Sequence, residues 1–234
     1  MNEFSSAIVA ALSMIVTLDE GLVEIVLLSL QVSLGAVTIA SVIALPLGAV
    51  IALQSFPGRR GVVILLNALM GLPPVVVGLV VYLLLSRAGP LGPMGLLFTP
   101  AAMIIAQSII VLPIIAALSR QTIADLHEEY DEHLRSLGCT PMQSVATLLW
   151  DGRFRLLTAI MAGFGRAIAE VGAVIIVGGN IQHATRVMTT TIALETSKGN
   201  LALALGLGLI LVTLALGVNA TALVISDAAR RRYG

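Results

Sequence analysis

Residues 25–58 read IVLLSLQVSLGAVTIASVIALPLGAVIALQSFPG and contain no Asp, Glu, Lys, Arg or His. A helix that crosses a membrane needs about 20 mainly apolar residues, because each residue rises about 1.5 Å through a hydrocarbon core roughly 30 Å thick. This stretch exceeds that length. It therefore predicts a transmembrane helix.

Four more stretches meet or nearly meet the same requirement. Residues 61–86, 88–119 and 199–226 are free of charge, and residues 156–179 are interrupted only by Arg166 and Glu170. The chain of 234 residues is 58% hydrophobic and 11% charged, whereas an ordinary soluble domain is roughly 25% charged. We therefore expect an all-α polytopic membrane protein with about five transmembrane helices.

The N-terminal segment, residues 1–18, has a different pattern. Phe4, Ile8, Leu12 and Ile15 recur at helical spacing over a length that is short for a span. This pattern predicts an interfacial helix that lies along the membrane surface. The segment has no Lys or Arg, which a cleaved signal peptide would carry at its start.

Two features of the predicted spans concern helix packing. Pro46 and the pair Pro73-Pro74 remove backbone donors, so we expect the helices that contain them to bend or break. In the last span, small residues recur four apart in two pairs that end at Gly206 and Gly208. Such pairs allow another helix to approach closely.

Positive charges divide unevenly between the two sides of the membrane. Lys and Arg favour the cytoplasmic side when they lie in short loops near the spans. One side carries only Arg87, Arg186 and Lys198. The other side carries Arg59, Arg60, Arg120, Arg135, Arg153, Arg155, Arg230, Arg231 and Arg232. Five spans with the N-terminus outside and the C-terminus in the cytoplasm satisfy this bias at every loop.

The sequence argues against several other classes of protein. The lone Cys139 cannot form an internal disulfide, and three scattered histidines are too few for a closed zinc site. The only lysine, Lys198, does not follow glycine, so the sequence has no Gly-Lys-Ser/Thr phosphate loop. If ATP drives this protein, we therefore expect another subunit to bind it. We expect no catalytic residue, metal ligand or cofactor in this chain. The alternative to a protein whose ATP binds another subunit is an ion-coupled secondary transporter.

One sizeable hydrophilic segment, residues 120–155, lies on the cytoplasmic side in this topology. Between residues 121 and 137, apolar residues spaced three and four apart predict an amphipathic helix with an exposed stripe. The stripe consists of Ile123, Leu126, Tyr130, Leu134 and Leu137. Gly138 can end this helix, and Thr140-Pro141 can begin another. An apolar stripe in a water-exposed segment indicates a docking surface for a partner.

Two stretches carry recognisable motifs. Glu132-His133-Leu134, followed by three residues and Gly138, resembles the Glu-Ala-Ala and Gly loop of the permease subunits of ABC importers, although Asp151 stands where the pattern expects proline. Residues 163–198 contain GFGRAIAEVG, VGGNI, TRVMTT and ALETSK. With Trp150, they resemble the tungstate-uptake branch, which is related to molybdate and sulfate permeases.

The resemblance implies a type I ABC importer transmembrane domain over residues 1–234, with residues 120–155 as a cytoplasmic coupling loop. It implies a homodimeric pore in a prokaryotic plasma (inner) membrane, two copies of a cytoplasmic ATPase and an extracytoplasmic oxyanion-binding protein. The residues that it assigns to ATPase coupling are Glu132, Gly138, Thr140, Pro141 and Met142. The implied substrate is tungstate, with molybdate or sulfate as alternatives, and substrate choice rests mostly with the binding protein.

Two charged residues interrupt the fourth span. Arg166 and Glu170 are four residues apart, which would place both on one helix face. A charge near the middle of a bilayer costs about 2.5–3.5 kcal/mol on insertion scales, so such residues usually pair or face a bundle interior. We expect an ion pair that holds the bundle together, and contact with a passing anion is the alternative.

Neutral donors lie near the ends of the last two spans. They are Asn180, Thr189, Thr190 and Thr191. Hydroxyl and amide groups can solvate a divalent oxyanion without trapping it. A polar external loop is the favoured interpretation of these residues, and contact with the anion is the alternative.

Overall fold

The computed structural model describes residues 3–233. Residues 1, 2 and 234, and the side chains of residues 3–7, 14, 223 and 225–233, lie outside the description. The predicted contribution of Phe4 to an interfacial stripe and the side chains of Arg230, Arg231 and Arg232 therefore fall outside the described part.

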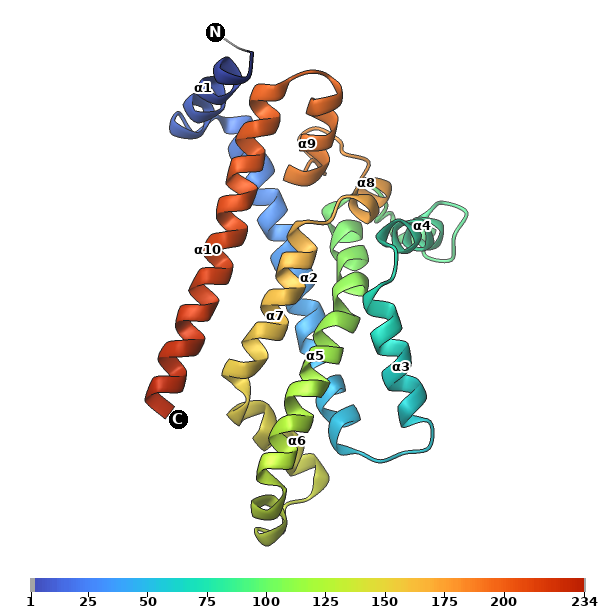
Figure 1. The fold of residues 1–234 in the computed structure, drawn as a ribbon. Helices are drawn as coiled ribbons and strands as arrows, with labels where there is room; N and C mark the ends of the chain where they lie inside the picture. The colour runs from blue at the N-terminus through green and yellow to red at the C-terminus, as the bar shows by residue number, and fades with distance from the viewer. Residues whose placement is uncertain (1–2, 234) are drawn as a thin grey trace. The chain divides into compact units, whose positions relative to one another are not determined.

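Within residues 3–233 the chain forms α-helices and one short 3-10 helix, with no β-strand (Figure 1). This confirms the all-α prediction. The helices are α1 (Glu3–Val16), α2 (Glu20–Leu53), α3 (Arg59–Met70), α4 (Pro74–Leu85), η1 (Gly92–Met94), α5 (Pro100–Ser136), α6 (Pro141–Asp151), α7 (Arg153–Ile168), α8 (Gly172–Gly178), α9 (Met188–Ser197) and α10 (Leu201–Tyr233).

Three helices are long and apolar enough to cross a membrane, namely α2, α5 and residues Leu201–Ala222 of α10. Two broken pairs, α3 with α4 and α7 with α8, pass the same test together, which gives up to five candidate spans. The break before α4 falls at Pro73-Pro74 as predicted, with Pro73 in an extended conformation (ψ 121°). Pro46 lies inside α2 and does not end it.

The break between α7 and α8 differs from the prediction. Because α7 ends at Ile168 and α8 begins at Gly172, Glu170 lies outside both helices, and the expectation that Arg166 and Glu170 share one helix face is wrong. Oε1 of Glu170 accepts a hydrogen bond from the N–H of Ala173 (3.1 Å), in the first turn of α8. A carboxylate is favourable there because the first N–H groups of a helix have no partner within it.

The third span also begins and ends differently from the prediction. Residues 86–99 form a turn-rich connection, so the helix begins only at Pro100. It then continues to Ser136, which makes the predicted cytoplasmic helix of residues 121–137 the last part of α5. The sequence contains no Gly or Pro between Pro113 and Gly138 that would interrupt it.

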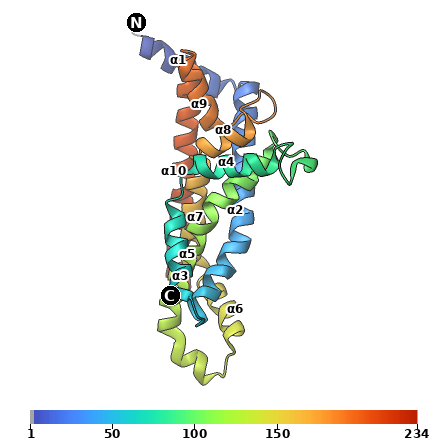
Figure 2. The same ribbon diagram turned by 90° about the vertical axis from the view of Figure 1, so that its right-hand side faces the viewer.

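The chain divides into two compact units. The first comprises Met1–Ala36, Pro73–Gln107 and Ala167–Gly217, and the second comprises Val37–Leu72, Ser108–Arg166 and Val218–Gly234. In the first unit, α8 lies beside α4 in both views (Figures 1 and 2). A Cβ atom at Gly78 of α4 would lie 2.7 Å from the Cα of Ala173 in α8, so this crossing requires glycine. At Gly206 of α10, by contrast, a Cβ atom would lie 3.6 Å from the Cβ of Ala11 in α1, an ordinary van der Waals contact.

The second unit has an apolar core that includes part of the hydrophilic segment. Ala49 and Ala52 of α2 pack with Ile123 and Leu126 of α5 and with Leu148 of α6. These residues come from three separate stretches of sequence. The core therefore fixes α6 against the C-terminal half of α5.

Candidate functional site

The segment of residues 120–155 reverses direction at Gly138. This residue has a φ of 68°, in the left-handed region. Its N–H donates to the carbonyl of Arg135 (3.0 Å), and the N–H of Cys139 donates to the carbonyl of Leu134 (3.0 Å). The two bonds form a Schellman motif, which satisfies carbonyls at the end of α5. The predicted helix stop at Gly138 is confirmed.

The next helix, α6, begins with a capping box. Thr140 is the N-cap, and Pro141 occupies the first turn. The N–H of Gln143 donates to Oγ1 of Thr140 (3.4 Å), and the N–H of Thr140 donates to Oε1 of Gln143 (2.8 Å). Each residue thus satisfies a backbone donor of the other. The prediction that Thr140-Pro141 begins a helix is confirmed.

The predicted apolar stripe on residues 123–137 is mostly covered. Ile123, Leu126 and Leu134 are buried in the core of the second unit. Only Tyr130 and Leu137 are exposed. The expectation that the whole stripe is exposed is therefore wrong, because residues of α2 and α6 pack over most of it.

The exposed apolar surface lies on α6 instead. Met142 and Trp150 are each 69% exposed, whereas Val145 and Leu148 on the opposite side of the helix are buried. Met142, Ala146 and Trp150 are four residues apart and share one helix face. We call this surface the α6 face. It is apolar and is exposed among the described residues of the second unit.

Charged residues flank α6 in the sequence. Glu132 is exposed near the end of α5. The guanidinium of Arg153 lies 4.7 Å from the centre of the Trp150 ring, a cation–π contact that holds the exposed indole in place. An apolar face bordered by charge is typical of a protein-binding surface.

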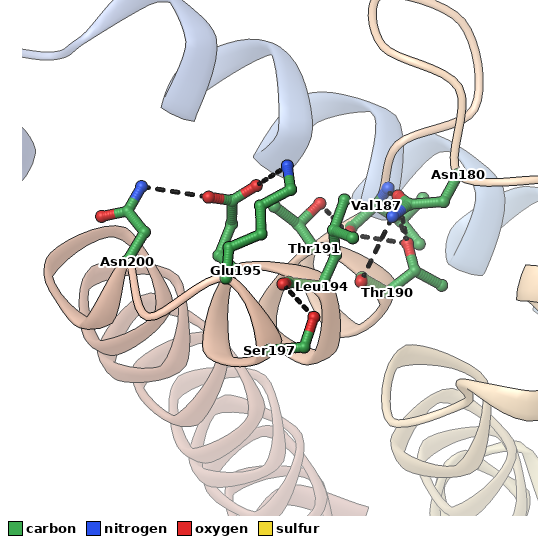
Figure 3. Close-up of polar contacts among 9 residues, drawn as sticks. Asn180, Val187, Thr190, Thr191, Leu194, Glu195, Ser197 and Asn200 are labelled. Carbon is green, nitrogen blue, oxygen red and sulfur yellow. Dashed lines mark hydrogen bonds and ion pairs between the residues drawn. The ribbon is translucent and has the colours of Figure 1, made fainter.

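The three predicted threonines belong to α9 in the first unit and are buried. Oγ1 of Thr189 donates to the carbonyl of Glu170 (2.8 Å), and Oγ1 of Thr191 donates to a carbonyl one turn earlier (2.7 Å). Oγ1 of Thr190 donates to Oδ1 of Asn180 (3.0 Å), as Figure 3 shows. The expectation of an external loop is wrong for the threonines, whose hydroxyls hold α9 in place.

Arg166 and Glu170 belong to different units of the chain. Arg166 is half-buried in the last turn of α7, and the Glu170 carboxylate is buried beside the first turn of α8. Pairing of these two side chains stays a prediction. The residues predicted to couple to an ATPase, from Glu132 to Met142, all lie in the second unit.

Glu195 is a buried charged residue that sequence reasoning missed. Its carboxylate lies at the C-terminal end of α9 and accepts hydrogen bonds from Nζ of Lys198 (2.9 Å) and Nδ2 of Asn200 (3.0 Å; Figure 3). These bonds, with the charges of Lys198 and Arg186, hold the pKa of Glu195 below its ordinary value against the effect of burial. The spacing of three between Glu195 and Lys198 was the available signal.

Thr185 is a second buried polar residue that sequence reasoning missed. Its Oγ1 donates to the carbonyl of Gly178 and accepts from the N–H of Ile181 (3.0 Å). These bonds fix the connection between α8 and α9. Within the described residues, no three His, Cys, Asp or Glu side chains are placed to hold a metal ion.

These features define an all-helical membrane protein whose short helix α6 presents an exposed apolar face between candidate spans. Residues 44–232 match the family model for the binding-protein-dependent transport system inner membrane component. The chain belongs to this family, the permease subunits of ABC importers.

Individual relatives cover much of the chain. It is 40% identical to a "probable anion ABC transporter permease protein" of Haloferax volcanii, over 91% of this chain and 94% of the relative. It is also 40% identical to the tungstate uptake system permease protein TupB of Peptoclostridium acidaminophilum, over 82% and 84% respectively. A sulfate transport system permease protein, CysT of Synechocystis, is 32% identical over 54% of this chain and 46% of the relative.

Membership of the family establishes the general role of the chain. It is a multi-pass protein of the inner membrane and a pore-forming subunit rather than an enzyme. It works with a separate ATPase and a substrate-binding protein.

Proposed function

We propose that this chain is the membrane-spanning subunit of an ATP-driven importer of tungstate. The observation that supports this proposal most directly is that the chain is 40% identical to TupB of Peptoclostridium acidaminophilum over 82% of its length. The sulfate permease CysT is less similar and matches only 54% of the chain. Tungstate therefore ranks ahead of sulfate as the substrate.

The proposed assembly is a homodimer of this chain with two ATPase subunits and an extracytoplasmic oxyanion-binding protein. The N-terminus lies outside and the C-terminus in the cytoplasm. The support for this orientation is the division of positive residues, nine on one side and three on the other. In this orientation, residues 120–155 face the ATPase.

In this assembly, α6 is the element that contacts the ATPase. The support is the α6 face, because an exposed apolar surface in water normally marks an interface. Met142 contributes directly to this face. Gly138, Thr140 and Pro141 fix the turn that presents it. Glu132, which is exposed, would meet a basic group of the partner.

The polar residues of the first unit hold the bundle together in this proposal. The hydroxyls of Thr189, Thr190 and Thr191 are engaged within the chain, as is the Asn180 side chain. Buried polar groups that are already hydrogen-bonded are costly to separate. Substrate choice then rests mostly with the binding protein.

Uptake by whole cells tests the substrate. Cells that lack their own oxyanion importers would express this chain with its ATPase and binding protein, and uptake of labelled tungstate, molybdate and sulfate would be measured. We expect tungstate uptake that disappears when this chain is omitted and that unlabelled sulfate does not compete. Stronger uptake of molybdate or sulfate than of tungstate would contradict the proposed substrate.

A further inference from the structure

A groove of about 700 Å³ lies at the C-terminal end of α4 in the first unit. It is bordered by the last turn of α4 and by the connection that leads to α5. Its lining includes Tyr82, Leu85, Arg87, Leu97 and Phe98. A groove of this size is within the range of small-ligand sites.

Arg87 has no counter-charge within the part of the chain that the structure describes. The sequence contains no Asp or Glu from Ile25 to Ala124. Among the described residues, the exposed Arg87 guanidinium forms no ion pair and no hydrogen bond. Two carboxylates of the first unit have other partners, since Glu24 pairs with His183 and Glu195 pairs with Lys198. Any anion that pairs with Arg87 therefore comes from outside the described residues.

The rest of the groove is suited to a ligand that is partly apolar. The rings of Tyr82 and Phe98 meet edge to face, with their centres 6.3 Å apart. The Tyr82 hydroxyl has no hydrogen-bond partner among the described residues. Leu85 and Leu97 add hydrocarbon to the same lining. The groove thus combines one cation, Arg87, and one phenol, Tyr82, with an apolar lining.

The surroundings identify the kind of ligand. Arg87 closely follows α4, the second helix of a pair that is bent by 99° and that has the length and composition of a broken span or a re-entrant loop. In either case, a polar residue just after the apolar helix belongs at the edge of the hydrocarbon. Arg and Tyr are favoured at this level because each combines an apolar body with a polar end. The neighbouring exposed side chains are apolar, namely Leu83, Leu84, Leu91 and Met94. A hydrocarbon surface around a single unpaired cation fits a lipid better than a water-soluble protein.

We propose that this groove binds the headgroup of an anionic glycerophospholipid. Arg87 donates charge-assisted hydrogen bonds to the phosphodiester, and the Tyr82 hydroxyl donates a further bond. The acyl chains lie along Leu97 and Phe98. The site does not depend on which oxyanion the protein transports.

Lipid retention by the full-length permease tests this site. The protein would be purified in mild detergent and titrated with phosphatidylglycerol, and bound lipid would be counted by native mass spectrometry. We expect Arg87→Gln to weaken lipid binding by roughly tenfold, because one charge-assisted contact is lost. Arg87→Lys should retain part of the binding. The control is Arg135→Gln, which removes an exposed arginine outside this groove.

Other outcomes would overturn the proposal. Equal lipid retention by Arg87→Gln and the unchanged protein would show that the groove is not the lipid site. Displacement of the lipid by millimolar inorganic phosphate would indicate a site for free phosphate. Unchanged lipid retention with weaker capture of the purified binding protein would assign Arg87 to that protein partner.

A second measurement locates the lipid directly. Phe98→Trp in a Trp150→Phe background places one tryptophan in the groove, since Trp150 is the only tryptophan of the chain. In vesicles of phosphatidylcholine, a small fraction of brominated phosphatidylglycerol should quench this tryptophan more than the same fraction of brominated phosphatidylcholine. Equal quenching by the two lipids would overturn the proposal even if Arg87→Gln folds poorly.

Discussion

Glu195 is the residue for which burial and charge give the clearest expectation. Its pKa is lowered from 4.5, first by the hydrogen bond from Lys198 and then by that from Asn200. Its contribution to stability is therefore fully present above pH 4.5 and is lost as the pH falls through the lower pKa of the folded state. We expect Glu195→Gln to cost about 2 kcal/mol at pH 7, which lowers the Tm by roughly 4–8 °C.

Thermal unfolding of the purified permease in detergent, measured from neutral to acidic pH, checks this expectation. The difference in Tm between Glu195→Gln and the unchanged protein should narrow as the pH falls below the pKa of Glu195. Glu128→Gln is the control, because Glu128 is exposed. A difference that stays constant with pH would show that the charge of Glu195 does not stabilise the fold.

At the scale of an element, the turn between α5 and α6 has a specific consequence for coupling. Gly138 has a φ of 68°, and a Cβ atom at this position would have no neighbour within 4 Å, so Gly138→Val meets backbone strain rather than a clash. The strain is about 1–2 kcal/mol. We expect near-normal amounts of permease in the membrane, with roughly 5–30-fold less ATPase retained on purification.

Gly199→Val is the matched control for this experiment. Gly199 also has a left-handed conformation (φ 80°) with open space around it, but it lies between α9 and α10. It should leave ATPase retention unchanged. If Gly138→Val instead lowered permease abundance in proportion to transport, the segment would serve only packing. Normal retention and normal uptake would remove the turn from the coupling mechanism.

The elements were predictable where one local signal decided them. Hydropathy gave the long spans, Pro73-Pro74 gave the break before α4, and Gly138 with Thr140-Pro141 gave the start of α6. The break at residues 169–171 has no Gly or Pro to mark it. Two hydrogen bonds hold this break at Glu170. Its carbonyl accepts a tertiary bond from Oγ1 of Thr189, and its carboxylate accepts a local bond from the N–H of Ala173.

The position of the candidate site could be predicted from the sequence, but the exposure of its side chains could be predicted only in part. Leu134 and Leu137 belong to the same stripe, yet one is buried and the other is 77% exposed. The difference arises from packing partners on α2 and α6 that are distant in sequence. The prediction of an external loop at the threonines of α9 failed for a similar reason. A run of polar residues is typical of a loop, and only the hydrogen-bond partners within the fold show that these hydroxyls are buried.

At the scale of the whole molecule, the distribution of positive charge predicts the orientation in the membrane. In a Cys139→Ser background, we expect Gln182→Cys, in the connection between α8 and α9, to react with a membrane-impermeant maleimide added to intact cells. Glu129→Cys should react only after the cells are opened. Both positions are exposed, so accessibility within the fold does not limit labelling. Labelling of Glu129→Cys from outside would contradict the proposed orientation.

The connection between α5 and α6 is short and closely hydrogen-bonded. Only four residues separate Ser136 from Pro141, and hydrogen bonds close the helix end on one side and the helix start on the other. Because both of its ends are closed by hydrogen bonds, we expect this turn to be rigid and to hold α5 and α6 at a fixed angle. If α6 contacts the ATPase as proposed, we therefore expect a displacement of α6 to reach the C-terminal end of α5 rather than to be taken up by bending of the turn.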